Sequence, residues 1–239
     1  MSDALAPHGP GLAILVNGPS SSGKSTLCRA LHARLTALAG DDATRQFGSV
    51  AFDDMLLMID ETMYPLSFVE LQGRDTSHLA SQFPHDGRAG WEYVDDNDAE
   101  GIHGGAPRVR AVLHPYVRRL LHGLHLGWGQ HLQLGTNLLI DHFLQDKDWA
   151  DECMEILGTN AGSVFSVRVD CDLEELERRE SYRADGELEG RPLGLARRSD
   201  ELCHSHGIAY NVAVSTSAQT TDESVNDILS ALRAAGHLG

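Results

Sequence analysis

The sequence predicts an α/β fold, with a five-stranded parallel sheet and helices on both of its faces. Two observations predict it: short apolar runs recur along the 239 residues, and segments with apolar residues at helical spacing lie between them. Because parallel strands are joined by crossover connections, usually helices, this alternation indicates a parallel sheet covered on both sides. At 41% apolar residues the chain can bury one large core, so we expect residues 1–239 to form a single domain.

The expected strands are short apolar runs, at residues 12–16, 47–52, 138–140, 164–169 and 208–214. Helical spacing predicts helices at residues 23–38, 108–125, 148–157, 172–183 and 222–234. The fourth of these helices begins with Asp172 and Glu175 at the spacing of a capping box. Residues 62–106 lack clear periodicity, and a loop of that length in a compact domain is usually functional or disordered.

Charge and cysteine content exclude several classes of partner. The formal net charge is −16, and nucleic acid or an anionic membrane requires a basic footprint, so we expect neither as a general partner. The four cysteines are widely spaced without a C-x-x-C pair, which is typical of a reducing compartment. No apolar run approaches the roughly 18 residues of a membrane span, so we expect a soluble, cytoplasmic protein whose oligomeric state the sequence leaves open.

A glycine-rich turn, GPSSSGKST at residues 18–26, follows the first expected strand and opens the first expected helix. It satisfies the pattern G-x-x-x-x-G-K-[ST] in the context that the pattern requires. Backbone N–H groups of such a loop wrap a polyphosphate, Lys24 reaches the β- and γ-phosphates, and Ser25 offers its hydroxyl to Mg²⁺. A Gly/Ser turn that only caps the helix is the alternative. We predict that ATP is bound by Gly18, Pro19, Ser20, Ser21, Ser22, Gly23, Lys24, Ser25 and Thr26.

Two aspartates follow the second and third expected strands, Asp53 and Asp141. Ligands of open α/β sheets bind outside the carboxyl ends of the strands, so both side chains are candidates for the site. Asp53 could accept the proton of an acceptor hydroxyl, and Asp141 could hold Mg²⁺ through water or a second-shell contact. The alternative for each is a helix N-cap, where aspartate is favoured.

Arginines border the polar, glycine-containing stretch at residues 184–190. Guanidinium groups on a closing loop stabilise a transferring phosphoryl group and exclude water, so we predict a lid at about residues 184–196 with Arg183 and Arg191 in catalytic roles. For Arg178 and Arg179, a solvated helix face with paired glutamates is the alternative.

These stretches together resemble the chloramphenicol phosphotransferase-like family of small P-loop kinases, which inactivate an antibiotic by phosphorylating its hydroxyl. The resemblance is carried by residues 15–25, 52–54, 139–144, 167–171, 179–183 and 209–211. It implies a P-loop kinase fold with a helical lid, with Asp53 as the catalytic base and with Arg183 and Arg191 in the lid. The chain is longer than typical members, mainly around residues 62–106, where the resemblance implies an insertion that shapes the acceptor site.

The resemblance therefore implies an ATP- and Mg²⁺-dependent phosphotransferase with a small hydroxylated acceptor, such as an antibiotic. A nucleotide or small-metabolite kinase is the main alternative, because fold, loop and lid would be alike. A non-catalytic ATP-binding module is a third. A regulatory GTPase is disfavoured, because Lys147, the second of only two lysines, lies in Gln-Asp-Lys-Asp and not in the Asn-Lys-x-Asp segment that reads guanine.

Acidic, aromatic and histidine residues complete the set of candidates. Asp95, Asp96, Asp98 and Glu100 form either a negative rim of the acceptor pocket or a solvated acidic loop. Trp91 and Tyr93 could line that pocket, whereas Trp128 fits core packing.

His122 and His125 share a helical face, and His204 and His206 flank Ser205. The sequence shows no carboxylate or cysteine that completes a zinc ligand set with them, so we expect no metal beyond Mg²⁺. His142 follows Asp141 directly, and we expect it to line the active site.

Overall fold

The computed structural model describes residues 9–59, 90–96, 106–184 and 192–238. A five-stranded sheet forms the centre of the fold, in the spatial order β2 (Phe47–Ala51), β5 (Asn137–His142), β1 (Leu12–Asn17), β6 (Ser163–Asp170) and β7 (Val212–Ser215). All neighbouring pairs in this sheet are parallel, so the predicted fold class is confirmed. The carboxyl ends of the strands therefore meet at one edge.

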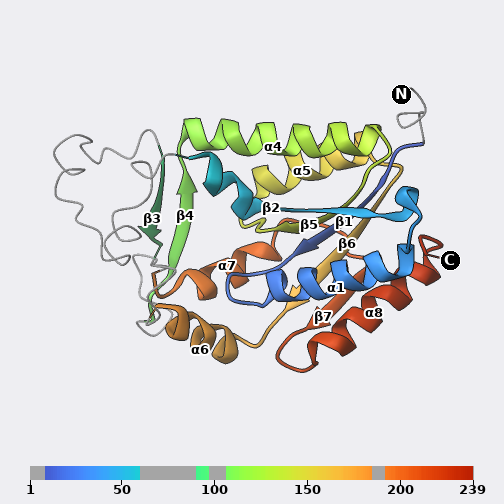
Figure 1. The fold of residues 1–239 in the computed structure, drawn as a ribbon. Helices are drawn as coiled ribbons and strands as arrows, with labels where there is room; N and C mark the ends of the chain where they lie inside the picture. The colour runs from blue at the N-terminus through green and yellow to red at the C-terminus, as the bar shows by residue number, and fades with distance from the viewer. Residues whose placement is uncertain (1–8, 60–89, 97–105, 185–191, 239) are drawn as a thin grey trace.

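Helices cover both faces of the sheet (Figure 1). α4 (Pro115–Gln133) and α5 (Lys147–Asn160) lie on one face. α1 (Lys24–Ala39) and α8 (Thr221–Ala234) lie on the other. The chain thus has the three layers that alternating strands and helices predict.

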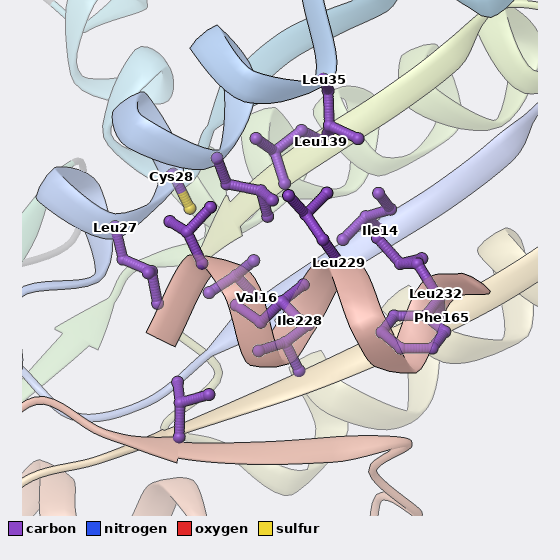
Figure 2. Packing of buried hydrophobic residues seen from close by; sticks show 14 of the residues in the cluster. Ile14, Val16, Leu27, Cys28, Leu35, Leu139, Phe165, Ile228, Leu229 and Leu232 are labelled. Carbon is purple, nitrogen blue, oxygen red and sulfur yellow. The ribbon is translucent and has the colours of Figure 1, made fainter. Parts of the chain in front are cut away.

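The central strand β1 is buried on both faces. Ile14 and Val16 pack against α1 and α8 (Figure 2), whereas Ala13 and Leu15 pack with the core under α4 and α5. All four side chains are fully buried. A strand enclosed in this way is apolar at every position, which is why its sequence shows a continuous run without alternation.

The segment 108–125, predicted as one helix, begins with a strand instead. β4 (Val109–Leu113) pairs antiparallel with β3 (Trp91–Asp95), and α4 begins only at Pro115. Proline has no N–H and pushes the preceding residue into extended conformation, so it starts a helix readily but does not sit inside one. The prediction is therefore wrong for residues before Pro115.

The expected second and last strands differ from the structure at their ends. β2 ends at Ala51, and a 3₁₀-helix, η3 (Phe52–Met58), follows it at once. The expected strand at 208–214 begins only at Val212, after Asn211 has already bonded Ser166 through both its main chain and its side chain. Another short 3₁₀-helix, η2 (Ala43–Arg45), connects α1 to β2.

The capping box expected at Asp172 and Glu175 is not formed. α6 (Leu173–Ala184) follows Asp172, whose N–H donates to the Ser217 hydroxyl at 3.0 Å, while the Glu175 carboxylate accepts from Arg178 and Arg179. The box prediction is wrong because a residue distant in sequence supplies the acceptor. In α8, Thr220 and Glu223 do form a reciprocal capping box.

Much of the expected acceptor-site insertion at 62–106 lies outside the described residues, and so does the centre of the expected lid. Beyond the lid gap, α7 (Leu195–Cys203) packs against α6. Arg191, Asp98 and Glu100 are likewise outside the described residues, and only the backbone of Arg183, in the last turn of α6, is described. The single domain, the insertion and the lid stay predictions.

The sequence analysis also made predictions about the cysteines and about membrane-spanning segments. Cys28, Cys153, Cys171 and Cys203 are all buried as free thiols. In the part of the chain that the structure describes, no helix combines the length and the apolar composition needed to cross a bilayer.

Candidate active site

The loop between β1 and α1 has a backbone that its glycines permit. A Cβ on Gly18 would lie 2.4 Å from the carbonyl oxygen of Val169, so no larger residue fits beside β6. Gly23 is in the left-handed region with φ of 87°, and Ser21 is there too with φ of 63°. Turned this way, residues 18–23 form a tight loop before the first turn of α1.

Contacts from three other elements hold this loop in place. The carbonyl oxygen of Ser22 accepts from the Thr216 hydroxyl at 2.6 Å, after β7, and from the Arg179 guanidinium at 3.3 Å, on α6. The Ser20 N–H donates to the hydroxyl of Ser199 on α7 at 2.9 Å. These bonds fix the loop backbone at Ser20 and at Ser22.

The loop fits a bound polyphosphate. The Lys24 ammonium is buried, with 9% of the residue exposed, and donates to the Pro19 carbonyl oxygen at 2.7 Å. The Ser22 hydroxyl is buried and has no hydrogen-bond partner among the described residues. The first turn of the 16-residue helix α1 contains no acidic residue, so its positive end is not neutralised there. A buried ammonium, an unsatisfied hydroxyl and a helix N-terminus together favour an anionic ligand.

A cavity of about 480 Å³ opens beside this loop, at the carboxyl edge of the sheet. Residues 20–26 form one wall, and Asp53 and Asp141 line the same cavity from the ends of β2 and β5. The structure therefore brings together Lys24, Ser25 and both predicted aspartates. Gly18 and Pro19 do not line the cavity and belong to the turn behind it. A hydroxyl and a carboxylate facing one space are suitable oxygen ligands for Mg²⁺.

Asp141 is not explained by helix capping. Asp141 lies inside β5, opposite Val16 of β1, and the N-cap of α5 is Asp146, whose carboxylate accepts from the Asp148 N–H at 2.9 Å. At the start of η3, the Asp54 carboxylate accepts from the Ala51 N–H at 2.8 Å. Asp53 is exposed towards the cavity beside it.

The family model for chloramphenicol phosphotransferase-like proteins matches residues 11–233. The chain belongs to this family. It is therefore a P-loop small-molecule kinase of an ATP-using family, which confirms the resemblance carried by the sequence motifs.

Solved structures show the same fold at low sequence identity. A gluconokinase from Sinorhizobium meliloti 1021 is 17% identical with a TM-score of 0.51, covering 95% of this chain and 93% of that one. A sugar kinase from Janibacter sp. HTCC2649 is 14% identical with a TM-score of 0.53, covering 96% and 99%. Likeness at these identities shows the fold alone. No curated protein matches the chain significantly.

In this chloramphenicol phosphotransferase-like chain, the cavity wall opposite the loop is largely apolar. Trp91 and Tyr93 of β3 line it as predicted, with ring centroids 4.8 Å apart, and Leu113 of β4 and Phe143 add to it. Trp128 is instead 3% exposed in the core under α4, also as predicted. An aromatic wall beside a phosphate-binding loop suits an acceptor with an apolar body.

Positively charged side chains are few among the described residues that line the cavity. Among the lining residues that the structure describes, the cations are Lys24 and Arg29, both on α1. Asp96, which we expected in a negative rim, forms ion pairs with Arg198 of α7 and with Arg110 of β4. Its charge is therefore compensated beside the Asp95–Val109 end of the β3–β4 pair.

A second pocket, of about 430 Å³, lies on the other side of the phosphate-binding loop and shares Ser21, Gly23 and Thr26 with the cavity. It is further lined by Leu27, Arg178, Arg179, Tyr182, Thr216, Gln219, Thr221 and Ser224. Sequence analysis missed this pocket. The spacing from Glu175 predicts the helix-surface pairs with Arg178 and Arg179, which are present, but it holds no signal for the contact of Arg179 with the loop.

His142 lies in the wall of the cavity, as predicted, and is fully buried. Its Nε2 atom is 2.8 Å from Nε2 of His125, and the Cys153 thiol completes a group of three possible ligand atoms within 4.8 Å of one another. The sequence analysis did not bring His125, His142 and Cys153 together, because they come from three different elements, α4, β5 and α5. Burial lowers the pKa of His125 to about 4 and holds the pKa of His142 well below its usual range.

Proposed function

We propose that this chain transfers the γ-phosphate of ATP to a hydroxyl of a small, antibiotic-like natural product. The observation that carries the proposal is the composition of one cavity. A phosphate-binding loop with Lys24 and Ser25 forms one wall, Asp53 and Asp141 stand at the strand ends, and aromatic side chains form the far wall. The phosphate donor and an apolar acceptor would thus meet at a carboxylate.

In this proposal the triphosphate lies along residues 18–26 and the nucleoside enters the second pocket beside Arg179. Ser25 and Asp141 would hold Mg²⁺, which supplies positive charge to the phosphate oxygens when bound. Arg179 and Thr216 keep the loop in shape through the Ser22 carbonyl oxygen. Arg183 and Arg191 remain proposed lid residues that stabilise the transferring group.

Asp53 is the proposed base. As the acceptor oxygen forms its bond to the γ-phosphorus, the bond from that phosphorus to the β,γ-bridging oxygen breaks, ADP leaves, and the hydroxyl proton passes to the Asp53 carboxylate. In a loose transition state this proton leaves late, so holding the hydroxyl in line contributes more than the basicity of the carboxylate.

A nucleotide or small-metabolite kinase is the second candidate, because the fold and the loop serve it equally well. An acceptor that already carries a phosphate needs cations opposite the loop, typically arginines. Among the described residues that line the cavity, both cations belong to α1, on the donor side. The apolar wall therefore favours an uncharged acceptor.

The test is incubation with ATP and Mg²⁺ against a panel of hydroxylated antibiotics and nucleosides, with mass spectrometry for one added phosphoryl group. Asp53→Asn should abolish the product while nucleotide affinity stays within a factor of about two, and Asp54→Asn is the matched control because Asp54 bonds the Ala51 N–H. Modification of nucleoside monophosphates alone would support the second candidate. A chain that binds ATP but yields no product with any acceptor would be a binding module.

A further inference from the structure

A chain of hydrogen-bonded side chains runs from the surface of α4 and α5 to the wall of the cavity. Arg118 donates to both carboxylate oxygens of Glu152, at 3.2 and 2.8 Å. Glu152 lies 2.8 Å from Nδ1 of His125, whose Nε2 lies 2.8 Å from Nε2 of His142. Nδ1 of His142 accepts from the Phe143 N–H at 2.8 Å. We call Glu152, His125 and His142 the histidine chain.

The hydrogen positions in the histidine chain follow from its two ends. The Phe143 N–H can only donate, so Nδ1 of His142 is an acceptor and the hydrogen of the neutral ring lies on Nε2. That hydrogen points at Nε2 of His125, which must therefore accept, so His125 carries its hydrogen on Nδ1 and donates it to Glu152. Every ring nitrogen has a partner, and Arg118 compensates the carboxylate charge.

The same atoms do not fit a metal site with Cys153. Two ligands of one tetrahedral zinc, each about 2.0–2.1 Å from it, lie about 3.3 Å apart, and both must present bare lone pairs. Here the Nε2 atoms are 2.8 Å apart, and the bond from Phe143 assigns a hydrogen to Nε2 of His142. A hydrogen bond explains the separation of the two atoms, and a shared ion does not.

His142 is next to three candidate catalytic groups. Asp141 precedes it in β5, and its ring stacks on Phe52, the residue before Asp53, with centroids 5.5 Å apart. The ring of Phe143, which follows it, lies 5.7 Å from the Lys24 ammonium. A shift of the His142 ring would therefore be transmitted to the base, to the metal-binding carboxylate and to the lysine at once.

We propose that His125 and Glu152 are positioning residues, which fix His142 and through it the geometry of Lys24, Asp53 and Asp141. The proposal rests on the function proposed above. The two rings of the histidine chain lie in an otherwise apolar layer with Trp128, Leu121 and Leu157. Apolar side chains could fill the same volume without needing hydrogen-bond partners. A satisfied buried polar network instead selects one ring orientation, because each alternative leaves a polar atom unpaired.

The assigned tautomers can be measured without any acceptor. In the full chain with ¹⁵N-labelled histidine, two-bond nitrogen–proton NMR spectra near neutral pH should show His142 with hydrogen on Nε2 and His125 with hydrogen on Nδ1. Two rings with bare Nε2 atoms and one equivalent of zinc in the purified protein would overturn the proposal. So would a charged ring at either position. Because ATP turnover is not read, this result is independent of the proposed function.

Two variants test the positioning role, His125→Phe and Glu152→Gln. The same result is expected for both, and Glu152→Gln alone decides if His125→Phe does not fold. His131→Phe, at an exposed histidine of the same helix, is the matched control. Glu152→Gln should lower magnesium-dependent ATP turnover about tenfold or more with nucleotide affinity within about twofold of wild type, and it should shift the amide resonances of Lys24, Asp53 and Asp141. Unchanged turnover, unmoved amides, or an equal loss of nucleotide binding would overturn the role. A wild-type chain that turns over no ATP would sink the proposed function, and the amide shifts would still decide the positioning role.

Discussion

Mild acid should destabilise this protein through His125. Its side chain is fully buried, and burial lowers its pKa from 6.5 to about 4. In the unfolded chain the imidazole takes up a proton as the pH falls through its ordinary pKa, whereas the folded protein resists that proton. The unfolded state therefore binds more protons between these two values, so stability is complete above about pH 6.5 and is lost as the pH falls towards 4.

The size of the effect follows from the two pKa values. At about 1.4 kcal/mol for each tenfold change in proton affinity, the full loss from His125 is about 3 kcal/mol, and about 2 kcal/mol of it is reached at pH 5. The charged groups that face the ring are Arg118 and His122 from α4, Glu152 from α5 and His142 from β5. The pKa of His142 is also lowered, so its contribution has the same sign.

Urea unfolding at about pH 7.5 and pH 5 measures the prediction, with wild type compared to His125→Phe. The phenylalanine variant lacks the titrating group, so its free energy of unfolding should fall by about 2 kcal/mol less than that of wild type between the two pH values. The exposed His131→Phe control should follow wild type. An equal pH dependence in wild type and His125→Phe would refute the account of His125 as a buried neutral ring.

Three further substitutions test the loop and the helices. Thr216→Val keeps the shape but removes the 2.6 Å bond to the Ser22 carbonyl oxygen, so urea unfolding should show a loss of about 1 kcal/mol, and fluorescent-nucleotide titration should show weaker binding; undiminished affinity would contradict the loop-holding role. Gly18→Ala places a Cβ 2.4 Å from the Val169 carbonyl oxygen and should cost about 1–3 kcal/mol in thermal unfolding. Gly123→Ala, in open space on α4, should stabilise by about 0.5–1 kcal/mol, and a lower urea midpoint would count against it.

The sequence predicted those features of the fold that depend on local pattern. The apolar run at 12–16 and the G-x-x-x-x-G-K-[ST] motif after it are both local, and β1 and its loop follow them. The position of Asp53 and Asp141 in one cavity could also be predicted, because the carboxyl ends of parallel strands share an edge whatever the details of packing. The prediction of one helix across Pro115 was wrong, because it followed the apolar periodicity and not the proline, which marks a helix start in the sequence.

The remaining features depend on contacts between distant segments. The pairing of His125 with His142 brings a ring from α4 to the end of β5, and the spacing of histidines along the chain does not encode it. The contact of Arg179 with the Ser22 carbonyl oxygen joins residues 157 positions apart. Such contacts are fixed by how helices pack on the sheet, so a single sequence shows the residues without showing that they meet.

One helix, α7, contacts both the phosphate-binding loop and the β3–β4 hairpin. Its Ser199 hydroxyl accepts the Ser20 N–H of the phosphate-binding loop, and its Arg198 pairs with Asp96 at the end of β3. At the start of the helix, the buried Glu180 carboxylate accepts the N–H groups of Gly194 and Ala196, which ties α7 to α6.

The Val109 N–H of β4 donates to the Gly194 carbonyl oxygen at 3.1 Å, on the same residue whose N–H donates to Glu180. The hairpin that carries Trp91 and Tyr93 is thus attached to the same helix as the loop that carries Lys24. Because packed elements move as units and not by local bending, α7 couples the position of the hairpin to that of the phosphate-binding loop.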